Sequence, residues 1–360
     1  MANIVDYIKW RGDLPMTVAP INEIDNLILA RIAYLPYEKV DLQERTSFEE
    51  LAPRFLKLDE EDFHQVDDMA LIKEAAKSVR FKDILFSDYV ENKNHETEEQ
   101  FAAVTVWLPN NELYVSYRGT DASIVGWKED FNMSFMMHVP SQVEGVAYLE
   151  DIATRYKLRK IRVGGHSKGG NVAVYASIFC KPRIQNRIVE VINADGPGFD
   201  KTIIESEAYK EIVTRVHTFI PQDSVIGRLL EHEEKYKVVE SIEKGIMQHD
   251  IYSWQVEGPN IIGYDSVTNG SEVVNEVVRS WLKNTTPEQR KNFINVVFDV
   301  INTTKVETVH DLSAGIVKNI GKIADTYKNI DDEEKKELKE IFKTLVKSSW
   351  DTLKEEYKKQ

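Results

Sequence analysis

The sequence predicts an α/β fold with a central, mostly parallel sheet, a helical N-terminal region and a helical C-terminal extension. Segments of helical apolar spacing alternate with short strand-like segments between about residues 123 and 220, which is typical of parallel strands joined by covering helices. Within this region a strand-like run over 161–166 turns through glycines into a helix-like run. A chain of 360 residues can also bury a substantial core.

The first 83 residues are predicted to be a mainly helical lead-in. Apolar residues between Ile24 and Leu35 recur at helical spacing, and Pro36 is expected to end that helix. Two further helices are predicted at about 48–55, which includes Pro53, and at about 69–79.

The next segments have strand character. Residues 84–90, 101–108 and 113–117 are rich in β-branched and aromatic side chains. A Pro-Asn-Asn turn separates the last two, so they are predicted to form a β-hairpin.

The remaining elements of the sheet region follow in alternation. Helices are expected over 123–135, 142–156 and the run after Ser167, and strands over 161–166, 187–193 and 215–220. Residues 236–241 and 260–266 are predicted to pair and to close the sheet. This gives a predicted domain over residues 1–270.

Residues 271–360 are predicted to be a charged helical extension packed on the same domain. Apolar residues between Leu338 and Tyr357 form a stripe on one helical face, which suits packing on the domain or on a second copy of the chain. A homo-oligomer formed through these helices is therefore possible. A helix lying on a membrane surface is the alternative, but acidic residues at 331–334 and 355–356 dilute its basic face.

The charge balance argues against nucleic acid as a partner. The net charge is −14, and residues 271–360 contain 16 Lys/Arg and 16 Asp/Glu, so the negative excess belongs to residues 1–270. Cys180 is the only cysteine, which excludes an intrachain disulfide. The chain lacks a basic start followed by an apolar segment, and no stretch of about 18 apolar residues occurs. We expect a cytoplasmic protein without stable membrane insertion.

The most informative motif is Gly165-His166-Ser167-Lys168-Gly169. A strand that turns sharply into a helix places its turn residue in a strained conformation and leaves little room two positions away, which glycines satisfy. The turn exposes the serine hydroxyl and puts the next amide at a helix N-terminus. A phosphate-binding loop is excluded because Gly170-Asn171 replace the required Lys and Ser/Thr. A glycine-rich turn with an incidental serine remains open until partners are found.

A catalytic serine needs a base and an acid, which follow it in the order acid, then histidine, in hydrolases with this turn. Asp195 and Asp223 each follow a predicted strand and are the two candidate acids. His249, flanked by bulky apolar residues, is the best candidate base. His232 lies in an acidic turn and His310 in the charged extension, whereas His166 and His217 are assigned to packing.

These residues carry a family resemblance. Residues 117–121 (Tyr-Arg-Gly-Thr-Asp), 165–170 (Gly-His-Ser-Lys-Gly-Gly) and 221–225 (Pro-Gln-Asp-Ser-Val) resemble, in order, three blocks of class 3 lipases. With residues 248–250 (Gln-His-Asp), 253–255 (Ser-Trp-Gln) and the N-terminal helical region, the chain is similar to the Mbeg1-like group of α/β-hydrolases. The resemblance implies the α/β-hydrolase fold.

The resemblance also implies roles for single residues. Ser167 matches the nucleophile and Asp223 the acid, although Ile226 stands where lipases have proline. Asp195 becomes the reserve acid. Thr120 and the amide of Lys168 match the oxyanion hole. The segment after Thr120 corresponds to a lid over an acyl pocket, or else it is a core-facing helix; its candidate residues are Trp127, Phe131, Phe135 and Met136.

The predicted function is a serine hydrolase that cleaves a carboxylic ester of an acyl chain, a small molecule or lipid, through Ser167, His249 and Asp223. This chemistry requires no metal and no cofactor. A thioesterase or peptidase would use the same triad. The alternative from another class is a non-catalytic scaffold with a hydrolase fold, which would need none of Thr120, Ser167, Asp223 and His249.

Overall fold

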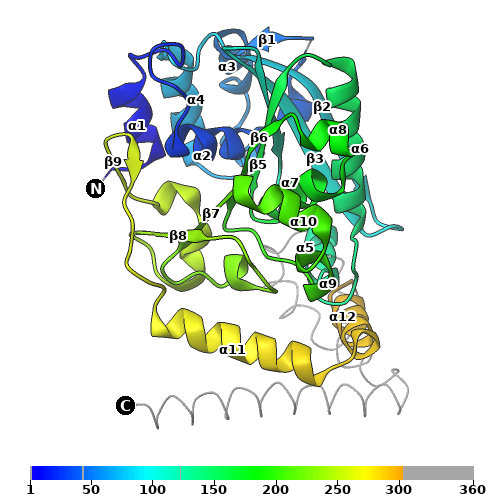
Figure 1. Cartoon of the computed structure of the whole chain (residues 1–360). Helices are drawn as coiled ribbons and strands as arrows, with labels where there is room; N and C mark the ends of the chain where they lie inside the picture. The colour runs from blue at the N-terminus through cyan, green and yellow to red at the C-terminus, as the bar shows by residue number, and fades with distance from the viewer. Residues whose placement is uncertain (1, 43, 122, 303–360) are drawn as a thin grey trace. The chain divides into compact units, whose positions relative to one another are not determined.

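The computed structural model describes residues 2–42, 44–121 and 123–302. An eight-stranded mixed sheet forms its centre (Figure 1). The strands are adjacent in sequence order: β1 Thr46–Ser47, β2 Leu85–Asn94, β3 Glu99–Leu108, β4 Glu112–Tyr117, β5 Lys160–His166, β6 Ile188–Ala194, β7 Val216–Pro221 and β8 Tyr236–Val239. Strands β4 to β8 are parallel, whereas β3 is antiparallel to β4 and β1 to β2.

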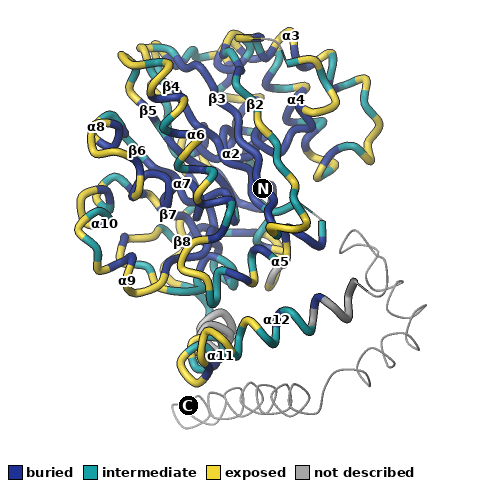
Figure 2. The backbone as a smooth tube through the Cα atoms, turned by 90° about the vertical axis from the view of Figure 1, so that its right-hand side faces the viewer, coloured by how far each residue is buried: buried dark blue, intermediate teal, exposed yellow. Residues whose placement is uncertain are grey.

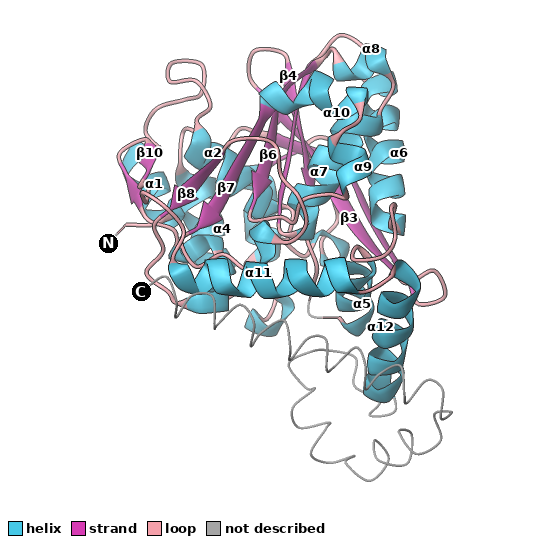
Figure 3. Cartoon of the chain, turned by 60° about the horizontal axis from the view of Figure 1, so that its bottom comes forward, coloured by secondary structure: helices cyan, strands magenta, loops and turns pink. Residues whose placement is uncertain are grey.

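Helices cover both faces of this sheet (Figure 3). One face packs against α1 Ile4–Arg11, α2 Glu23–Ile32, α3 Phe48–Phe55 and α4 Asp67–Lys77. The other packs against α6 Pro140–Arg155, α7 Lys168–Phe179, α9 Lys201–Ile204 and α10 Glu207–Ile212, with the short α8 Pro182–Gln185 beside them. Strands β3 to β7 and α2 are accordingly mostly buried (Figure 2). Two apolar layers therefore fix the central strands from both sides.

The chain divides into two compact units. The first comprises Met1–Asn92, Phe101–Gly119 and Ser141–Thr268, and the second Lys93–Gln100, Thr120–Pro140 and Asn269–Gln360. The described part of the second unit contains α5 Ile124–Asn132, α11 Asn269–Asn284 and α12 Pro287–Asn302. There Ile124 of α5 packs with Ile294 and Phe298 of α12. The predicted packing of residues 271–360 on the hydrolase domain stays a prediction, and the 338–357 stripe lies outside the described residues.

The predicted fold class is confirmed. A mostly parallel sheet with helices on both faces and a strand-turn-helix around Ser167 is the α/β-hydrolase fold. The predicted hairpin is also confirmed, as β3 and β4. Among the described helices, none is long and apolar enough to cross a membrane.

The expected pairing of 236–241 with 260–266 is only partly found. Strand β8 pairs in parallel with β7, and its contact with the later segment is an isolated bridge between Val239 and Gly263. Instead, β10 Asn260–Ile261 pairs with β9 Val256–Glu257. The left-handed Gly258, with φ of 62°, turns the chain back on itself directly after β9, so β10 pairs with β9, its neighbour in the sequence.

Candidate active site

Ser167 occupies a strained turn between β5 and α7. Its φ of 59° and ψ of −133° lie outside the regions favoured by residues with a side chain, and such strain costs about 1–3 kcal/mol. The Ser167 N–H donates to the carbonyl of Ala194 at 2.9 Å, which fixes the turn against the end of β6. Ser167 is partly exposed although His166 and Lys168 on either side are buried. The turn therefore presents one hydroxyl from an otherwise buried segment.

Close backbone approach explains the two glycines that frame this serine. A Cβ added to Gly165 would lie 2.4 Å from the backbone of Gly169, and a Cβ on Gly169 would lie 2.2 Å from the carbonyl oxygen of Tyr117. Neither contact is possible for a real side chain. The end of β4 and the start of α7 thus press on the turn, which accounts for the Gly-x-Ser-x-Gly spacing predicted from the sequence.

The base is joined to an acid at a neighbouring strand end. His249 Nδ1 lies 2.6 Å from Asp195 Oδ2, and the exposed fractions of the two side chains are 25% and 1%. A carboxylate accepts, so Nδ1 carries the proton and Nε2 of the neutral ring is left as the basic nitrogen. This is the arrangement of the acid and base in a hydrolytic triad.

Asp195 is itself fixed by the loop that follows β7. Its Oδ1 accepts from the Ser224 hydroxyl at 2.5 Å and from the Gly227 amide at 3.2 Å. The backbone of Asp195 has φ of 50°, a second strained residue next to the Ser167 turn. Because one oxygen is held by Ser224 and Gly227, the other is oriented toward His249.

The expected pairing of His249 with Asp223 is not found, and the structure pairs His249 with Asp195 instead. Asp223 Oδ2 accepts from the Gln248 side chain at 2.9 Å and from the Gly245 amide at 3.2 Å, while its Oδ1 accepts from the Thr268 hydroxyl. The Asp223 N–H also donates to Gln248 Oε1 at 2.7 Å. The Asp223 carboxylate is therefore occupied by these donors. Through Gln248, the residue before His249, it holds the loop that carries the base.

Of the other histidines, His166 is buried as expected, whereas His217 and His232 differ from their expected places. His166 is buried but does more than fill space, since its Nε2 lies 2.7 Å from the carbonyl oxygen of His249. His217, expected to pack, has a side chain that is 53% exposed. His232, expected in a solvated turn, is largely buried and lies 2.9 Å from Glu234, which itself binds the buried hydroxyls of Tyr209 and Thr218. His310 lies outside the described residues.

The remaining predicted residues are placed as follows. Lys168 begins α7, so its amide is at the helix N-terminus as expected. The Thr120 hydroxyl donates its proton to Asp130 at 2.6 Å within the second unit. The proton that an oxyanion would need from this hydroxyl is therefore already donated to a carboxylate. Trp127, Phe131 and Met136 are more than a third exposed, while Phe135 packs against the Ile124 cluster. The lid and oxyanion roles stay predictions.

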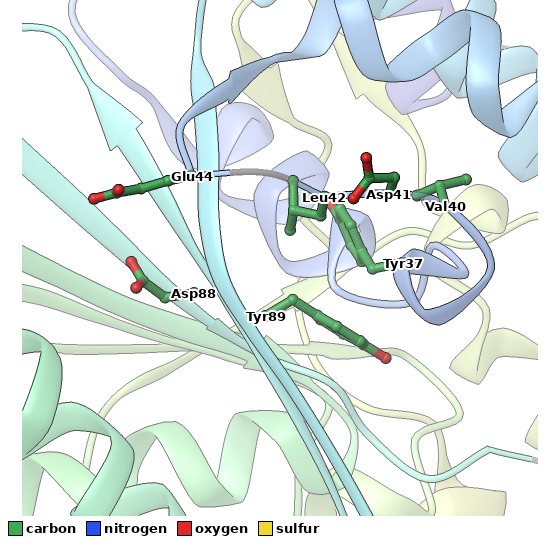
Figure 4. Close-up of a pocket in the computed structure, with 7 residues that line it drawn as sticks. All are labelled: Tyr37, Val40, Asp41, Leu42, Glu44, Asp88 and Tyr89. Atoms are coloured by element: carbon green, nitrogen blue, oxygen red, sulfur yellow. The ribbon is translucent and has the colours of Figure 1, made fainter.

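A separate cavity of about 470 Å³ lies in the first unit, lined by Tyr37, Val40, Asp41, Leu42, Glu44, Asp88 and Tyr89 (Figure 4). It contains none of the residues that carry the Ser167 site. In the described part of the chain, no group of three or more His, Cys, Asp or Glu side chains could hold a metal ion.

A match between the sequence and a family model establishes the family of this chain. The model described as Mbeg1-like matches residues 75–299, which includes Ser167, Asp195 and His249. The chain belongs to the Mbeg1-like family. No curated protein sequence matches this Mbeg1-like chain.

Solved structures that resemble this Mbeg1-like protein in part are lipases. A lipase from Rhizopus microsporus var. chinensis is 16% identical, with 69% of this chain and 81% of that chain covered and a TM-score of 0.36. A structure described as a fungal lipase is 13% identical, with 69% and 88% covered and a TM-score of 0.40. The native Rhizomucor miehei lipase propeptide complex is 16% identical, with 44% of this chain covered and a TM-score of 0.33.

The chain spans 57% of the length of that propeptide complex. At these identities the likeness concerns the fold alone, so the chemistry of the Mbeg1-like protein has to be argued from its own residues. Sequence reasoning gave no role to Ser224, Gly227, Gln248 or Tyr34, and it did not identify His166 as a hydrogen-bond donor. Ser224 and Gln248 adjoin predicted site residues and lie in the blocks 221–225 and 248–250 that carry the family resemblance, and this was their signal in the sequence.

Proposed function

We propose that this protein is a serine hydrolase that cleaves a carboxylic ester of an acyl chain, with Ser167 as nucleophile, His249 as base and Asp195 as acid. The observation that carries the proposal is the Asp195–His249 hydrogen bond of 2.6 Å, at the strand end where Ser167, in a strained and partly exposed turn, donates its N–H to Ala194. Burying the Asp195 carboxylate to 1% exposure costs free energy that its hydrogen bonds must offset. A non-catalytic scaffold would have no need for such a carboxylate directed at a histidine.

The chemistry follows the order of the triad. His249 Nε2 takes the proton of Ser167 Oγ as that oxygen bonds to the ester carbonyl carbon, and Asp195 stabilises the imidazolium. The amide of Lys168, at the N-terminus of α7, would donate to the oxyanion. Collapse breaks the bond to the alcohol, which receives the proton from His249. Water then hydrolyses the acyl-enzyme by the same proton transfers in reverse.

An acyl substrate is favoured by the apolar segment after Thr120. Trp127, Phe131, Met136 and Met137 are exposed on the second unit, and large apolar side chains of this kind suit contact with a hydrocarbon chain. Hydrolysis rates of p-nitrophenyl esters from acetate to palmitate, compared with matched thioesters and amides, distinguish an acyl esterase from a thioesterase or a peptidase.

A fluorophosphonate probe with detergent present tests the proposal. We expect covalent labelling of the wild-type protein and none of Ser167→Ala. Ser177→Ala is the matched control, because Ser177 lies on the same helix, is buried, and donates to the Ala173 carbonyl within that helix. Wild-type protein that is folded but neither labelled nor active on any ester would overturn the proposal.

A further inference from the structure

A buried histidine joins the nucleophile turn to the loop of the base. His166, the residue before Ser167, has its Nε2 2.7 Å from the carbonyl oxygen of His249. The two rings also stack, with centroids 4.5 Å apart and an angle of 35° between their planes. One residue of the Gly-x-Ser-x-Gly motif therefore contacts both the backbone and the side chain of the proposed base.

This contact fixes the tautomer of His166. A carbonyl oxygen can only accept, so His166 Nε2 carries a proton. Burial, with a smaller contribution from the nearby His249, lowers the pKa of His166 well below its usual range, so Nδ1 of the neutral ring is an acceptor. The Tyr34 hydroxyl lies 3.1 Å from both His166 Nδ1 and the His166 carbonyl oxygen, and its one proton serves one of these acceptors at a time.

Tyr34 is supported in turn by a buried charged network. The Arg31 guanidinium lies over the Tyr34 ring, 4.6 Å from its centroid, and forms a bidentate pair with Asp68. Asp68 also accepts from the hydroxyl of Tyr252, three residues after His249. The network thus links the C-terminal end of α2 and the first turn of α4 to the segment that carries the base.

Two consecutive carbonyls of the base loop are held by ring N–H donors. Trp254 Nε1, fully buried, donates to the Gln248 carbonyl at 2.8 Å, and His166 Nε2 donates to the next carbonyl, that of His249. Residues 245–249 form a single 3₁₀ turn, whose few internal hydrogen bonds would not fix it alone. The position of the His249 ring therefore depends on these donors as well as on Asp195 and on the contacts of Asp223 with the loop.

We propose that His166 is a positioning residue of the hydrolytic site: its Nε2–H holds the backbone of His249, and the Tyr34 hydroxyl holds His166 in place. The inference rests on the proposed function of His249 as the base. It assigns a role to the N-terminal helical region as well, since Tyr34 lies before the residues matched by the family model.

Three variants separate positioning from packing. His166→Phe keeps an aromatic ring against His249 but loses the donor, His166→Gln keeps a donor near Nε2, and Tyr34→Phe removes only the hydroxyl. His217→Gln is the matched control, because that histidine is exposed. The readouts are kcat and KM on a p-nitrophenyl ester and the far-downfield proton resonance of the His249–Asp195 hydrogen bond, assigned by its loss in Asp195→Asn.

We expect His166→Phe to lower kcat roughly 10- to 100-fold with KM within about two-fold, because a small displacement of a base affects the reaction more than binding. Its downfield resonance should shift or broaden, and His166→Gln should recover most of both signals. Tyr34→Phe should give a smaller loss of the same kind, and it tests the inference if substitutions of His166 prevent folding.

Equal losses in His166→Phe and His166→Gln, or a wild-type resonance and kcat in folded His166→Phe, would overturn the inference. If the protein does not fold when His166 is substituted, a wild-type kcat and a wild-type resonance in Tyr34→Phe would overturn the inference. A wild-type protein that resists fluorophosphonate yet shows a downfield resonance perturbed in His166→Phe would leave the positioning role standing and remove the proposed hydrolase function. The resonance thus separates the two failures.

Discussion

The turn after β6 and the loop after β7 each present a carboxylate at the same edge of the sheet, but the two carboxylates have different surroundings. Asp195 is 1% exposed and uses one oxygen for His249 and the other for Ser224 and Gly227. Asp223 uses both oxygens for the loop itself, through Gln248, Gly245 and Thr268. A position at a strand end is therefore insufficient to make a triad acid, because the donors around it decide where its charge is directed.

The sharpest test of this comparison is to neutralise each carboxylate in turn. Asp195→Asn should lower kcat by about 10³- to 10⁴-fold, since an amide in place of the acceptor favours the wrong tautomer of His249. Asp223→Asn should lower kcat by less than about 10-fold, as expected for weakened loop hydrogen bonds. Steady-state rates and fluorophosphonate labelling rates measure both, and the reverse ranking would restore Asp223 as the acid.

Steric displacement of Asp195 is a second test, with a smaller expected effect. A Cβ on Gly227 would lie 2.2 Å from Asp195 Oδ1 and 2.8 Å from Ile220 Cγ2. Gly227→Ala should therefore lower kcat roughly 10- to 100-fold and the free energy of unfolding by about 1–3 kcal/mol. Gly263→Ala is the control, because its nearest neighbour would be 3.8 Å away. An unaffected kcat in Gly227→Ala would mean that Asp195 is not held for catalysis.

Acidification should lower the free energy of unfolding through the buried His166. Its pKa is lowered by burial, so the unfolded chain binds a proton near the ordinary histidine pKa of about 6.5 while the folded protein does not. The contribution is fully present above that pH and is lost as the pH falls. The free energy of unfolding should therefore decrease between pH 7 and pH 5. Denaturant unfolding should show a shallower pH dependence in His166→Phe, and an unchanged slope would contradict the lowered pKa.

The smallest effect is expected on the Asp223 side. Thr268→Val removes the hydroxyl that donates to Asp223 and should cost about 1–2 kcal/mol of unfolding free energy with only a few-fold change in kcat. Thr202→Val is the matched control, because its hydroxyl donates to Asp200 at an exposed helix start. Calorimetry compares the two. A loss of kcat in Thr268→Val as large as that in Asp195→Asn would erase the difference between the two loops.

The local elements were predictable because their signals are local. The Gly-x-Ser-x-Gly spacing predicted the strand-turn-helix at β5 and α7, and side-chain type predicted the β3–β4 hairpin. The acid was not settled by chain order, since Asp195 and Asp223 both follow strands. Choosing between them required the positions of Ser224, Gly227 and Gln248, which come from segments up to 53 residues from Asp195 along the chain.

The sequence by itself determined the class of the sheet, the serine in the turn between strand and helix, and His249 as the candidate base. Only the tertiary structure decided that Asp195 meets His249 and that His166 and Trp254 hold the base loop. The physical reason is that hydrogen-bond partners are selected by distance and direction in space. Neither quantity is encoded in the spacing of two residues along the chain.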